Sequence, residues 1–197
     1  MSGAPKLTRQ DLMSLEQYSE ARPAFRERVI AHKANRRVAL GPHATLVFED
    51  QLTITYQIQE MLRVERIFNA AGIEEELAAY NPLIPDGSNW KATFLIEYPD
   101  AEQRALELAK MAGIEHKVWA RAGTGERIFA IANEDLERSN EDKTAAVHFL
   151  RFELDHATVA ALQGGVALEL GIEHDNLPYQ ITVSDAARSS LLADLSS

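Results

Sequence analysis

The chain has 197 residues, of which 46% are hydrophobic and 25% are charged, and its formal net charge is −10. A chain of this length and composition can bury a sizeable core without a disulfide or a structural metal ion. It contains no cysteine, which excludes disulfides, thiolate nucleophiles, zinc–thiolate sites and cysteine-ligated iron–sulfur clusters in this chain.

The amino-terminal stretch MSGAPKLTRQDL lacks the apolar region of a signal peptide. No segment approaches the ~20 apolar residues that a membrane-spanning helix needs. We therefore expect a soluble, cytoplasmic protein with no membrane partner. Thr8 and Asp11 have the spacing of a capping box, which predicts a short helix after Thr8.

Pro23 suits the first turn of a helix and predicts one that runs to about Asn35. Two short apolar runs follow, Val38 to Leu40 and ATLVFE at 44–49, and the turn signal Gly41-Pro42 separates them. We interpret both runs as strands. Asp50 then has the side chain of a helix N-cap.

Residues 51–71 are predicted to form a long helix that ends at Gly72. The β-branched run LTITY also suits a continuing strand. The helix is favoured because the following QIQEMLRVERIF is rich in strong helix formers. A short helix is predicted at 74–80, and NPLIPDGSN reads as a loop because of its two prolines and its Asp-Gly pair.

The second half changes to strands with short helices between them. Asp100, Asp155 and Ser184 are placed as N-caps of three helices, the first running through Met111 and closed by Gly113. The predicted strands are KATFLIEY, HKVWARA and ERIFAIA as a hairpin about Gly123-Thr124-Gly125, TAAVHFLRFEL, residues 166–172, and YQITV. The polar stretch ERSNEDK is predicted to be a loop.

These elements predict an α+β protein, with N-terminal helices and a long central helix packed on a largely antiparallel sheet with interleaved short helices. Neither half shows a linker or an unbroken core pattern of its own. We therefore expect one domain over residues 1–197, with a helical part at about 7–80 and a sheet-rich part at about 90–195.

No linear motif of a known catalytic or cofactor site occurs. The chain has no glycine-rich dinucleotide motif after a strand, no P-loop, no G-x-S-x-G elbow and no H-E-x-x-H. No cofactor is implied by motif, and the sequence leans away from an enzyme without excluding one.

Polar residues inside apolar helix sectors are the best indication of a site. On the predicted central helix, Gln57, Glu60 and Glu65 fall among apolar positions, and buried carboxylates need partners. On the preceding helix, His32 and Arg36 extend the inward stripe of Phe25 and Val29, so they are candidate partners. The candidate polar site comprises His32, Arg36, His43, Gln57, Glu60 and Glu65.

Two interpretations of this site stay open. The first is a structural network of ion pairs and hydrogen bonds in the core. The second is a catalytic or metal site that uses His32 with Glu60 or Glu65. His43 follows the turn at Gly41-Pro42, where its side chain either caps the turn or reaches a cleft.

The segment from Arg22 to Arg37 contains six basic residues and one acid, so it carries +5 while the rest of the chain carries −15. Such a face is solvated, pairs with the chain's own acids, or docks an acidic partner. Nucleic acid is not an expected partner, because the −15 remainder would repel it. The candidate docking residues are Arg22, Arg26, Arg28, Lys33 and Arg37.

Four strings carry a resemblance over nearly the whole chain: RVIAHKANRRVALGPHATLVFED, YQIQEMLRVERIF, YNPLIPDGSNWKATFLIEYPD and TAAVHFLRFEL. With them the chain resembles a bacterial domain-of-unknown-function family. Such proteins are similar to ones often encoded beside rubrerythrin and a cysteine-rich iron–sulfur protein of the heterodisulfide-reductase type. The resemblance implies a redox or peroxide-stress setting and supplies no catalytic residues.

Two classes of function therefore remain. One is an accessory or binding protein that serves a redox partner, such as a rubrerythrin or an iron–sulfur protein, and docks through Arg22–Arg37. The other is an enzyme or metal-binding protein with its site around His32, His43, Glu60 and Glu65. The lack of cysteine and of catalytic motifs favours the first.

Overall fold

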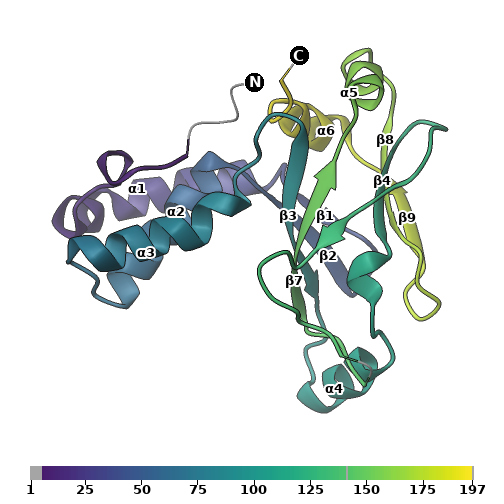
Figure 1. The fold of residues 1–197 in the computed structure, drawn as a ribbon, viewed down its shortest axis with the longest axis horizontal. Helices are drawn as coiled ribbons and strands as arrows, with labels where there is room; N and C mark the ends of the chain where they lie inside the picture. Colours follow the sequence, from purple (N-terminus) through teal and green to yellow (C-terminus); the bar gives the residue numbers. More distant parts are fainter. Residues whose placement is uncertain (1–5, 141, 197) are drawn as a thin grey trace.

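The computed structural model describes residues 6–140 and 142–196. Figure 1 shows a layer of helices that projects to one side of a body made of two sheets. The α+β class is therefore confirmed, with two antiparallel sheets in place of the one that the sequence suggests. In the described part of the chain, no helix is both long enough and apolar enough to cross a membrane.

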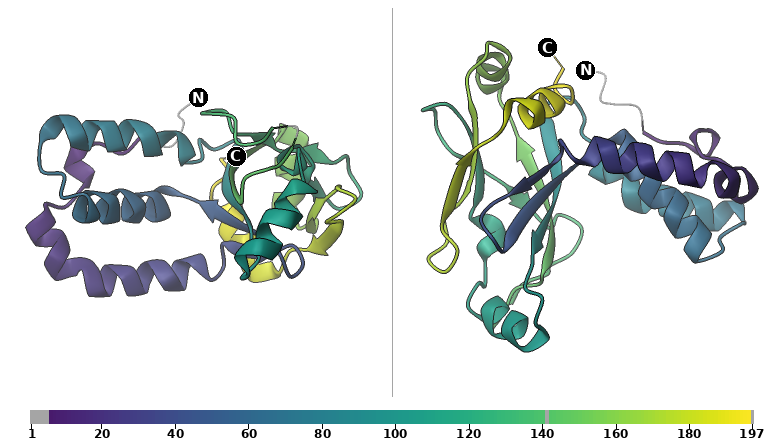
Figure 2. Two further views of the ribbon diagram at one scale, coloured as in Figure 1. Left: turned by 90° about the horizontal axis from the view of Figure 1, so that it is seen from below. Right: turned by 180° about the vertical axis from the view of Figure 1, so that it is seen from behind.

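Three helices lie side by side in the projecting layer: α1 (Leu15–Lys33), α2 (Gln51–Val64) and α3 (Ala70–Tyr80). Figure 2 shows the same layer from two further sides. Ile54, Ile58 and Leu62 of α2 pack with Leu77 of α3 in a small apolar core that is separate from the main one. Short 3₁₀ turns flank the layer at η1 (Arg9–Asp11) and η2 (Asn81–Leu83).

Helix α1 begins eight residues before the predicted start at Pro23. Ser14 is its N-cap and accepts a hydrogen bond from the backbone N–H of Gln17 at 3.2 Å. Pro23 lies inside the helix on an exposed side. Tyr18, upstream of the proline, is fully buried, so tertiary packing holds the first turns in place despite the missing backbone donor.

The LTITY segment is helical, and Asp50 caps α2 as predicted, with its side chain accepting from the N–H of Thr53 at 3.0 Å. The helix ends at Val64, earlier than the predicted Ala71. Arg66 adopts a left-handed φ of 53°, and Asn69 caps a new helix by accepting from Gly72 N–H at 2.7 Å. Gly72 therefore lies inside α3 and does not end the preceding helix.

Each sheet is built from antiparallel neighbours. The first, sheet A, has the order β1-β2-β3-β7-β6, and the second, sheet B, has the order β5-β4-β8-β9. Sheet A contains β1 (Arg37–Ala39), β2 (Ala44–Glu49), β3 (Asn89–Ile96), β6 (Ile131–Ala132) and β7 (Val147–Glu153). Sheet B contains β4 (Val118–Ala122), β5 (Ile128–Phe129), β8 (Leu168–Ile172) and β9 (Tyr179–Thr182).

The main core lies between the two sheets. Phe48, Trp90 and Phe152 of sheet A join Ala120 and Leu170 of sheet B in one buried cluster. The remaining elements close the ends of this core, with α5 and α6 at one end in Figure 1 and α4 at the other. They are α4 (Ala101–Ala109), η3 (Ile114–His116), α5 (His156–Gln163) and α6 (Asp185–Leu192), and the caps Asp100, Asp155 and Ser184 are confirmed.

The outer face of sheet A turns away from this core. Because side chains alternate along a strand, the residues between the core positions point outward. They form aligned rows across the sheet: Thr45 with Leu95 and Val147, Val47 with Thr93 and Phe149, and Glu49 with Lys91 and Arg151. This face meets the helical layer, and the candidate site lies there.

Candidate functional site

A polar network joins the carboxyl end of α1 to β2, α2 and α6. Arg36 is 1% exposed and donates to the backbone oxygens of Phe48 at 3.0 Å and Glu49 at 3.1 Å. Its guanidinium also contacts Asp194 Oδ2 at 2.5 Å. The half-buried His32 lies with Nε2 2.5 Å from Asp50 Oδ2, which is 3.5 Å from Arg36 Nε.

The carboxylates in this network differ from those that the sequence suggested. His32 and Arg36 meet Asp50 and Asp194, and neither meets Glu60 or Glu65. Burial raises the pKa of Asp194 to about 6, against the opposing effect of Arg36. Every polar group of Arg36 has a partner from another element. The network therefore fits a structural network of ion pairs and hydrogen bonds in the core, the first of the two interpretations given above.

Glu60 forms a second cluster on the inner side of α1. Arg22 binds its carboxylate with both Nε at 2.6 Å and NH2 at 3.0 Å, and the buried Tyr18 hydroxyl donates to it at 2.7 Å. Arg63 donates to the same group at 3.1 Å. The hydrogen bonds from Arg22 lower the pKa of Glu60 to about 2. A carboxylate so fully engaged by the chain's own donors ties α1 to α2.

We expect Glu60→Gln to lower the free energy of unfolding by about 1 kcal/mol at about pH 7, because it removes a partly buried ion pair. The folded-state pKa of about 2 lies below the ordinary 4.5. The ionised group therefore contributes stability above about pH 4.5, and that contribution is lost as the pH falls toward 2. Urea titrations of both proteins should converge at the acid end. Glu65→Gln, an exposed change at the end of α2, serves as the control, and an equal loss there would contradict this role.

The other predicted polar residues lie apart. Glu65 is exposed at the end of α2. His43 stacks on Tyr98 with ring centroids 4.0 Å apart, and its Nδ1 lies 3.0 Å from the oxygen of Glu97. The structure does not bring His32, Glu60 and Glu65 together. Over residues 6–140 and 142–196, no three histidine or acidic side chains form a group that could hold a metal ion.

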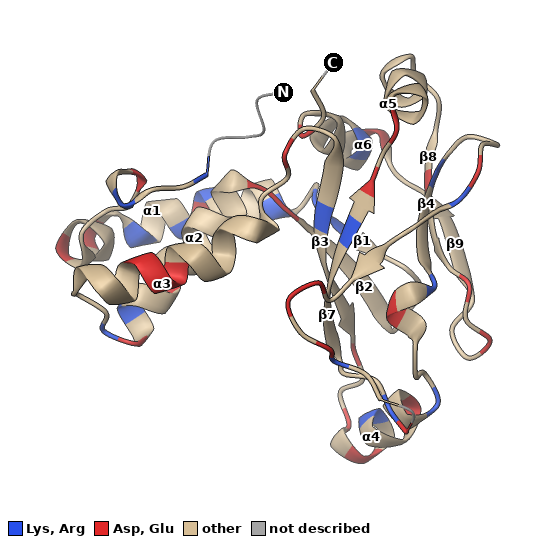
Figure 3. Ribbon diagram, viewed as in Figure 1, with Lys and Arg blue, Asp and Glu red and all other residues tan. Residues whose placement is uncertain are grey.

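The basic segment is divided in the structure. Arg22 is bound to Glu60, and Arg37 pairs with Glu97 at 2.9 Å on the surface. Arg26 and Arg28 are exposed and Lys33 is half-buried. Arg26 and Lys33 share one side of α1 with Ile30, because these three follow the i, i+4, i+7 spacing. Figure 3 marks the basic positions along α1.

A cleft of about 610 Å³ lies between this side of α1 and the outer face of sheet A, and we call it the α1–sheet cleft. Its walls are largely apolar, and Ile30 at its edge is 54% exposed. Its lining residues are Ile30, Lys33, Ala34, Arg37, Val47, Glu49, Gln57, Thr93, Leu95 and Phe149. Of the residues predicted from the sequence, Gln57, Lys33 and Arg37 meet here.

Glu49 is the one acidic group in the lining of this cleft, and it is 2% exposed. Its oxygens accept hydrogen bonds from Thr53 Oγ1 at 2.6 Å and Thr93 Oγ1 at 2.8 Å. Gln57 Nε2 donates from 3.2 Å. Neutral donors thus satisfy this buried carboxylate, as buried charges require. Of the two basic side chains in the lining, Arg37 pairs with Glu97, whereas Lys33 has no ion-pair partner among the described residues.

Sequence reasoning missed Glu49 because it ends an apolar run and so looks like the last residue of a strand. The signal was present in the alternation of Thr45, Val47 and Glu49 on the face opposite Leu46 and Phe48. For Phe149, the sequence predicts a position in a strand but no part in a site. Its place in the cleft depends on pairing with β3, which lies more than fifty residues away in the sequence.

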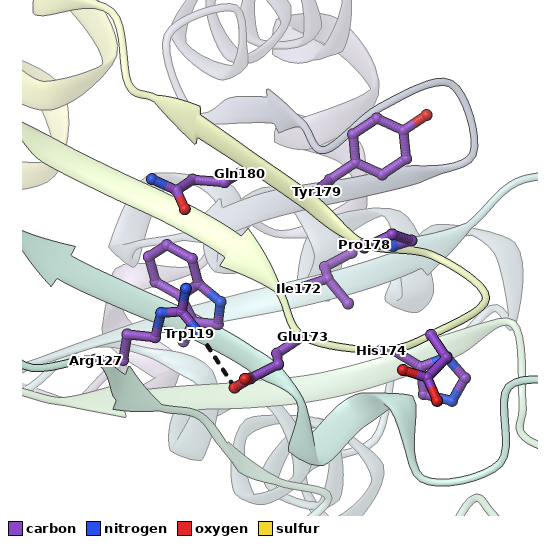
Figure 4. Close-up of a pocket in the computed structure, with 9 residues that line it drawn as sticks. Trp119, Arg127, Ile172, Glu173, His174, Pro178, Tyr179 and Gln180 are labelled. Atoms are coloured by element: carbon purple, nitrogen blue, oxygen red, sulfur yellow. Dashed lines mark ion pairs between the residues drawn. The ribbon is translucent and has the colours of Figure 1, made fainter.

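Another cavity, of about 440 Å³, lies on the outer face of sheet B (Figure 4). Of its two aromatic residues, Trp119 is 1% exposed, and the Arg127 guanidinium lies over its ring at 4.4 Å. Arg127 also pairs with Glu173 at 3.3 Å. A ligand would have to displace this ion pair to reach the ring, so the α1–sheet cleft is the better candidate.

The fully buried His148 has no catalytic geometry. Its Nδ1 lies 2.9 Å from the side-chain nitrogen of Asn133, which can only donate, so the ring proton is on Nε2. Nε2 in turn lies 2.8 Å from Thr144 Oγ1 and 3.0 Å from Ala145 O. Burial lowers the pKa of His148 and keeps it neutral. It therefore cannot act as a base toward Thr144.

Known proteins place the whole chain in one family without assigning an activity. Residues 6–195 match the model of a protein family of unknown function, DUF3501. A crystal structure of a protein of unknown function from Burkholderia pseudomallei is similar over 98% of this chain and 100% of its own, with 48% identity and a TM-score of 0.93. No curated protein matches the chain. The expectation of a domain-of-unknown-function family is thereby confirmed, and the chain belongs to the DUF3501 family.

Proposed function

We propose that this protein is an accessory binding protein whose α1–sheet cleft takes an acidic segment of a partner protein. The observation that carries the proposal is a cationic rim around exposed apolar surface on a chain whose net charge is −10. Lys33 and Arg37 line the cleft with Ile30, and Arg26 lies one turn before Ile30 on the same side of α1. Exposed apolar patches with polar rims mark interaction sites.

The chemistry of the cleft favours an acidic peptide over a nucleic acid. A duplex would present its phosphates to the rest of the molecule, which is strongly acidic, whereas a short acidic segment meets only the rim. The apolar floor of Val47, Leu95 and Phe149 provides contact area for the hydrophobic residues of that segment. Aromatic and aliphatic anchors in such a floor supply most of the affinity of an interface.

The family resemblance directs the choice of partner. Proteins of this kind are similar to ones often encoded beside rubrerythrin and an iron–sulfur protein of the heterodisulfide-reductase type, so these two are the partners we propose to test. A cysteine-free chain cannot ligate a cluster through thiolates, so a cysteine-ligated iron–sulfur cluster would belong to the partner. We propose a cytoplasmic location for the protein.

We expect Arg26→Glu with Lys33→Glu to slow association with the true partner roughly tenfold, because rim charges act mainly on the encounter rate. The measurement is surface-binding kinetics against each purified candidate, with duplex DNA as a third ligand. Binding of the unmodified protein should weaken with salt, since exposed charges are screened over ~10 Å at 0.1 M ionic strength. Ile30→Asp should act chiefly on the dissociation rate.

Lys110→Glu with Lys117→Glu is the matched control, because it makes the same change of charge on exposed residues at the far end of the sheets. These variants should keep most of the association rate. Tight binding to DNA would contradict the proposal. So would an association rate with the partner that changes neither with salt nor with the charge reversals at Arg26 and Lys33.

A further inference from the structure

A separate cavity of about 530 Å³ lies between α3 and the outer face of sheet A, and we call it the α3–sheet cavity. Phe149 stands between it and the α1–sheet cleft and lines both. Its walls are mainly apolar and include Ala79, Tyr80, Leu83 and Phe149. A volume of this size suits a small organic molecule.

Lys91 enters this cavity from β3. It is half-buried, and its Nζ donates to the backbone oxygen of Pro82 at 2.8 Å in an exposed hydrogen bond. Within the described residues, its Nζ has no carboxylate in ion-pair range. The neighbouring acids are occupied by other partners. Glu49, opposite Lys91 on β2, accepts from Thr53, Thr93 and Gln57. Arg151 binds both Glu134 and Glu153.

The surroundings lower the pKa of the Lys91 amine from its ordinary value. Burial lowers the pKa of Lys91, and the positive charge of Arg151 lowers it further. Asp86, Glu134 and Glu153 oppose this shift without reversing it. The charged groups around the amine come from β2, α3, β7 and the flanking loops: Glu49, Glu76, Asp86, Glu134, Asp135, Arg151 and Glu153. Asp135 is held by Arg138.

We propose that Lys91 is a nucleophilic lysine that captures an apolar aldehyde or ketone in the α3–sheet cavity as a reversible imine. A desolvated lysine next to another cation is the arrangement that activates lysine for carbonyl chemistry. The Nζ lone pair attacks the carbonyl carbon and forms a C–N bond. The carbon–oxygen bond then breaks, and the oxygen leaves as water with the two protons of the amine. No oxidant or reductant takes part.

Cavity and amine make separate contributions to this capture. The apolar walls hold the carbon skeleton, which raises the local concentration of the carbonyl group beside Nζ. The hydrogen bond to Pro82 O fixes the end of an otherwise flexible side chain. This inference is independent of the proposed docking function, since the residues tested here lie outside the α1–sheet cleft.

The test is reductive trapping of the full chain with benzaldehyde and cyanoborohydride at about pH 7, followed by peptide mass mapping. We expect the adduct at Lys91 to form several-fold faster than at Lys117, an exposed lysine. The rate at Lys91 should also reach its plateau at a lower pH than the rate at Lys117. Formaldehyde, which gains nothing from apolar walls, should discriminate less between the two lysines.

Lys91→Arg keeps the positive charge and should abolish the fast adduct, whereas Lys117→Arg should leave it unchanged. Ala79→Phe narrows the cavity without touching the amine, and it should slow benzaldehyde trapping more than formaldehyde trapping. Circular dichroism checks that each variant is folded. The proposal is overturned if Lys91 reacts no faster than Lys117, or if benzaldehyde and formaldehyde show the same preference for it.

Discussion

Arg36→Met should lower the free energy of unfolding by about 3–5 kcal/mol, the cost of breaking a buried ion pair from one side. The substitution removes donors from the oxygens of Phe48 and Glu49 and leaves the Asp194 carboxylate, 9% exposed, without its cation. Arg36 connects the end of α1 to β2 and to α6 near the carboxyl terminus, so the loss should affect the whole body. Urea denaturation followed by circular dichroism measures it.

The loss should depend on pH in a defined direction. Burial already raises the pKa of Asp194 to about 6 with Arg36 in place, and removing the guanidinium raises it further. A group whose folded-state pKa is raised contributes stability at low pH that is lost as the pH rises through that pKa. The deficit of Arg36→Met should therefore be larger at about pH 8 than at about pH 5.

A second substitution separates charge from packing. Adding Asp194→Asn to Arg36→Met removes the uncompensated carboxylate, so the double variant should be more stable than the single one at about pH 8 and should lose the pH dependence. Arg37→Met is the control, because its ion pair with Glu97 is exposed and is worth about 1 kcal/mol or less. Equal losses at Arg36 and Arg37 would remove the basis for the buried connection.

Local signals in the sequence predicted local structure well. Asp50, Asp100, Asp155 and Ser184 were each placed at the start of a helix, and each accepts a hydrogen bond from the backbone N–H three residues later. A cap depends only on its neighbours in the chain, so its prediction needs no tertiary information. The hairpin of β4 and β5 follows for the same reason, but only the first part of ERIFAIA joins it, because β6 pairs with β7 in sheet A.

Predictions failed where packing outweighs local preference. Pro23 was placed at a helix start, but the helix continues through it because Tyr18 is held in contact with Glu60 on α2. The end of α2 could not be predicted from Arg66. A left-handed backbone is unusual for a residue other than glycine, so the sequence does not indicate one there. The signal that could have been used was Asn69, a good N-cap.

The sequence indicated which buried charged residues need an ion-pair partner, but it did not identify the partners. Glu60 was expected to need a cation, and it has one, but that cation is Arg22, which was assigned to a docking face. Arg36 was placed on the inward stripe, and its partner Asp194 lies 158 residues further along the chain. Such a pairing depends on how α6 packs at the end of the sheets, which no periodicity in the sequence encodes.

Ile58→Ala should destabilise the entire chain by about 2–5 kcal/mol, although Ile58 belongs only to the small core of the helical layer. The two cores are separate clusters, but we expect the helical layer and the two-sheet body to unfold together. Chain order argues that they do. Strands β1 and β2 of sheet A lie between α1 and α2 in the sequence. The segment that joins the first two helices of the layer is therefore part of the two-sheet body.

The two tryptophans make this a direct test of the single domain. Trp90 and Trp119 are both buried in the sheets, so fluorescence reports on the body, whereas far-UV circular dichroism also reports on the helical layer. In a single cooperative domain, both probes give the same midpoint, and Ile58→Ala shifts both by the same amount. Val64→Ala, on the same helix but 60% exposed, should change the stability by less than about 0.5 kcal/mol. A circular-dichroism midpoint that moves while the fluorescence midpoint stays fixed would show that the helical layer unfolds on its own.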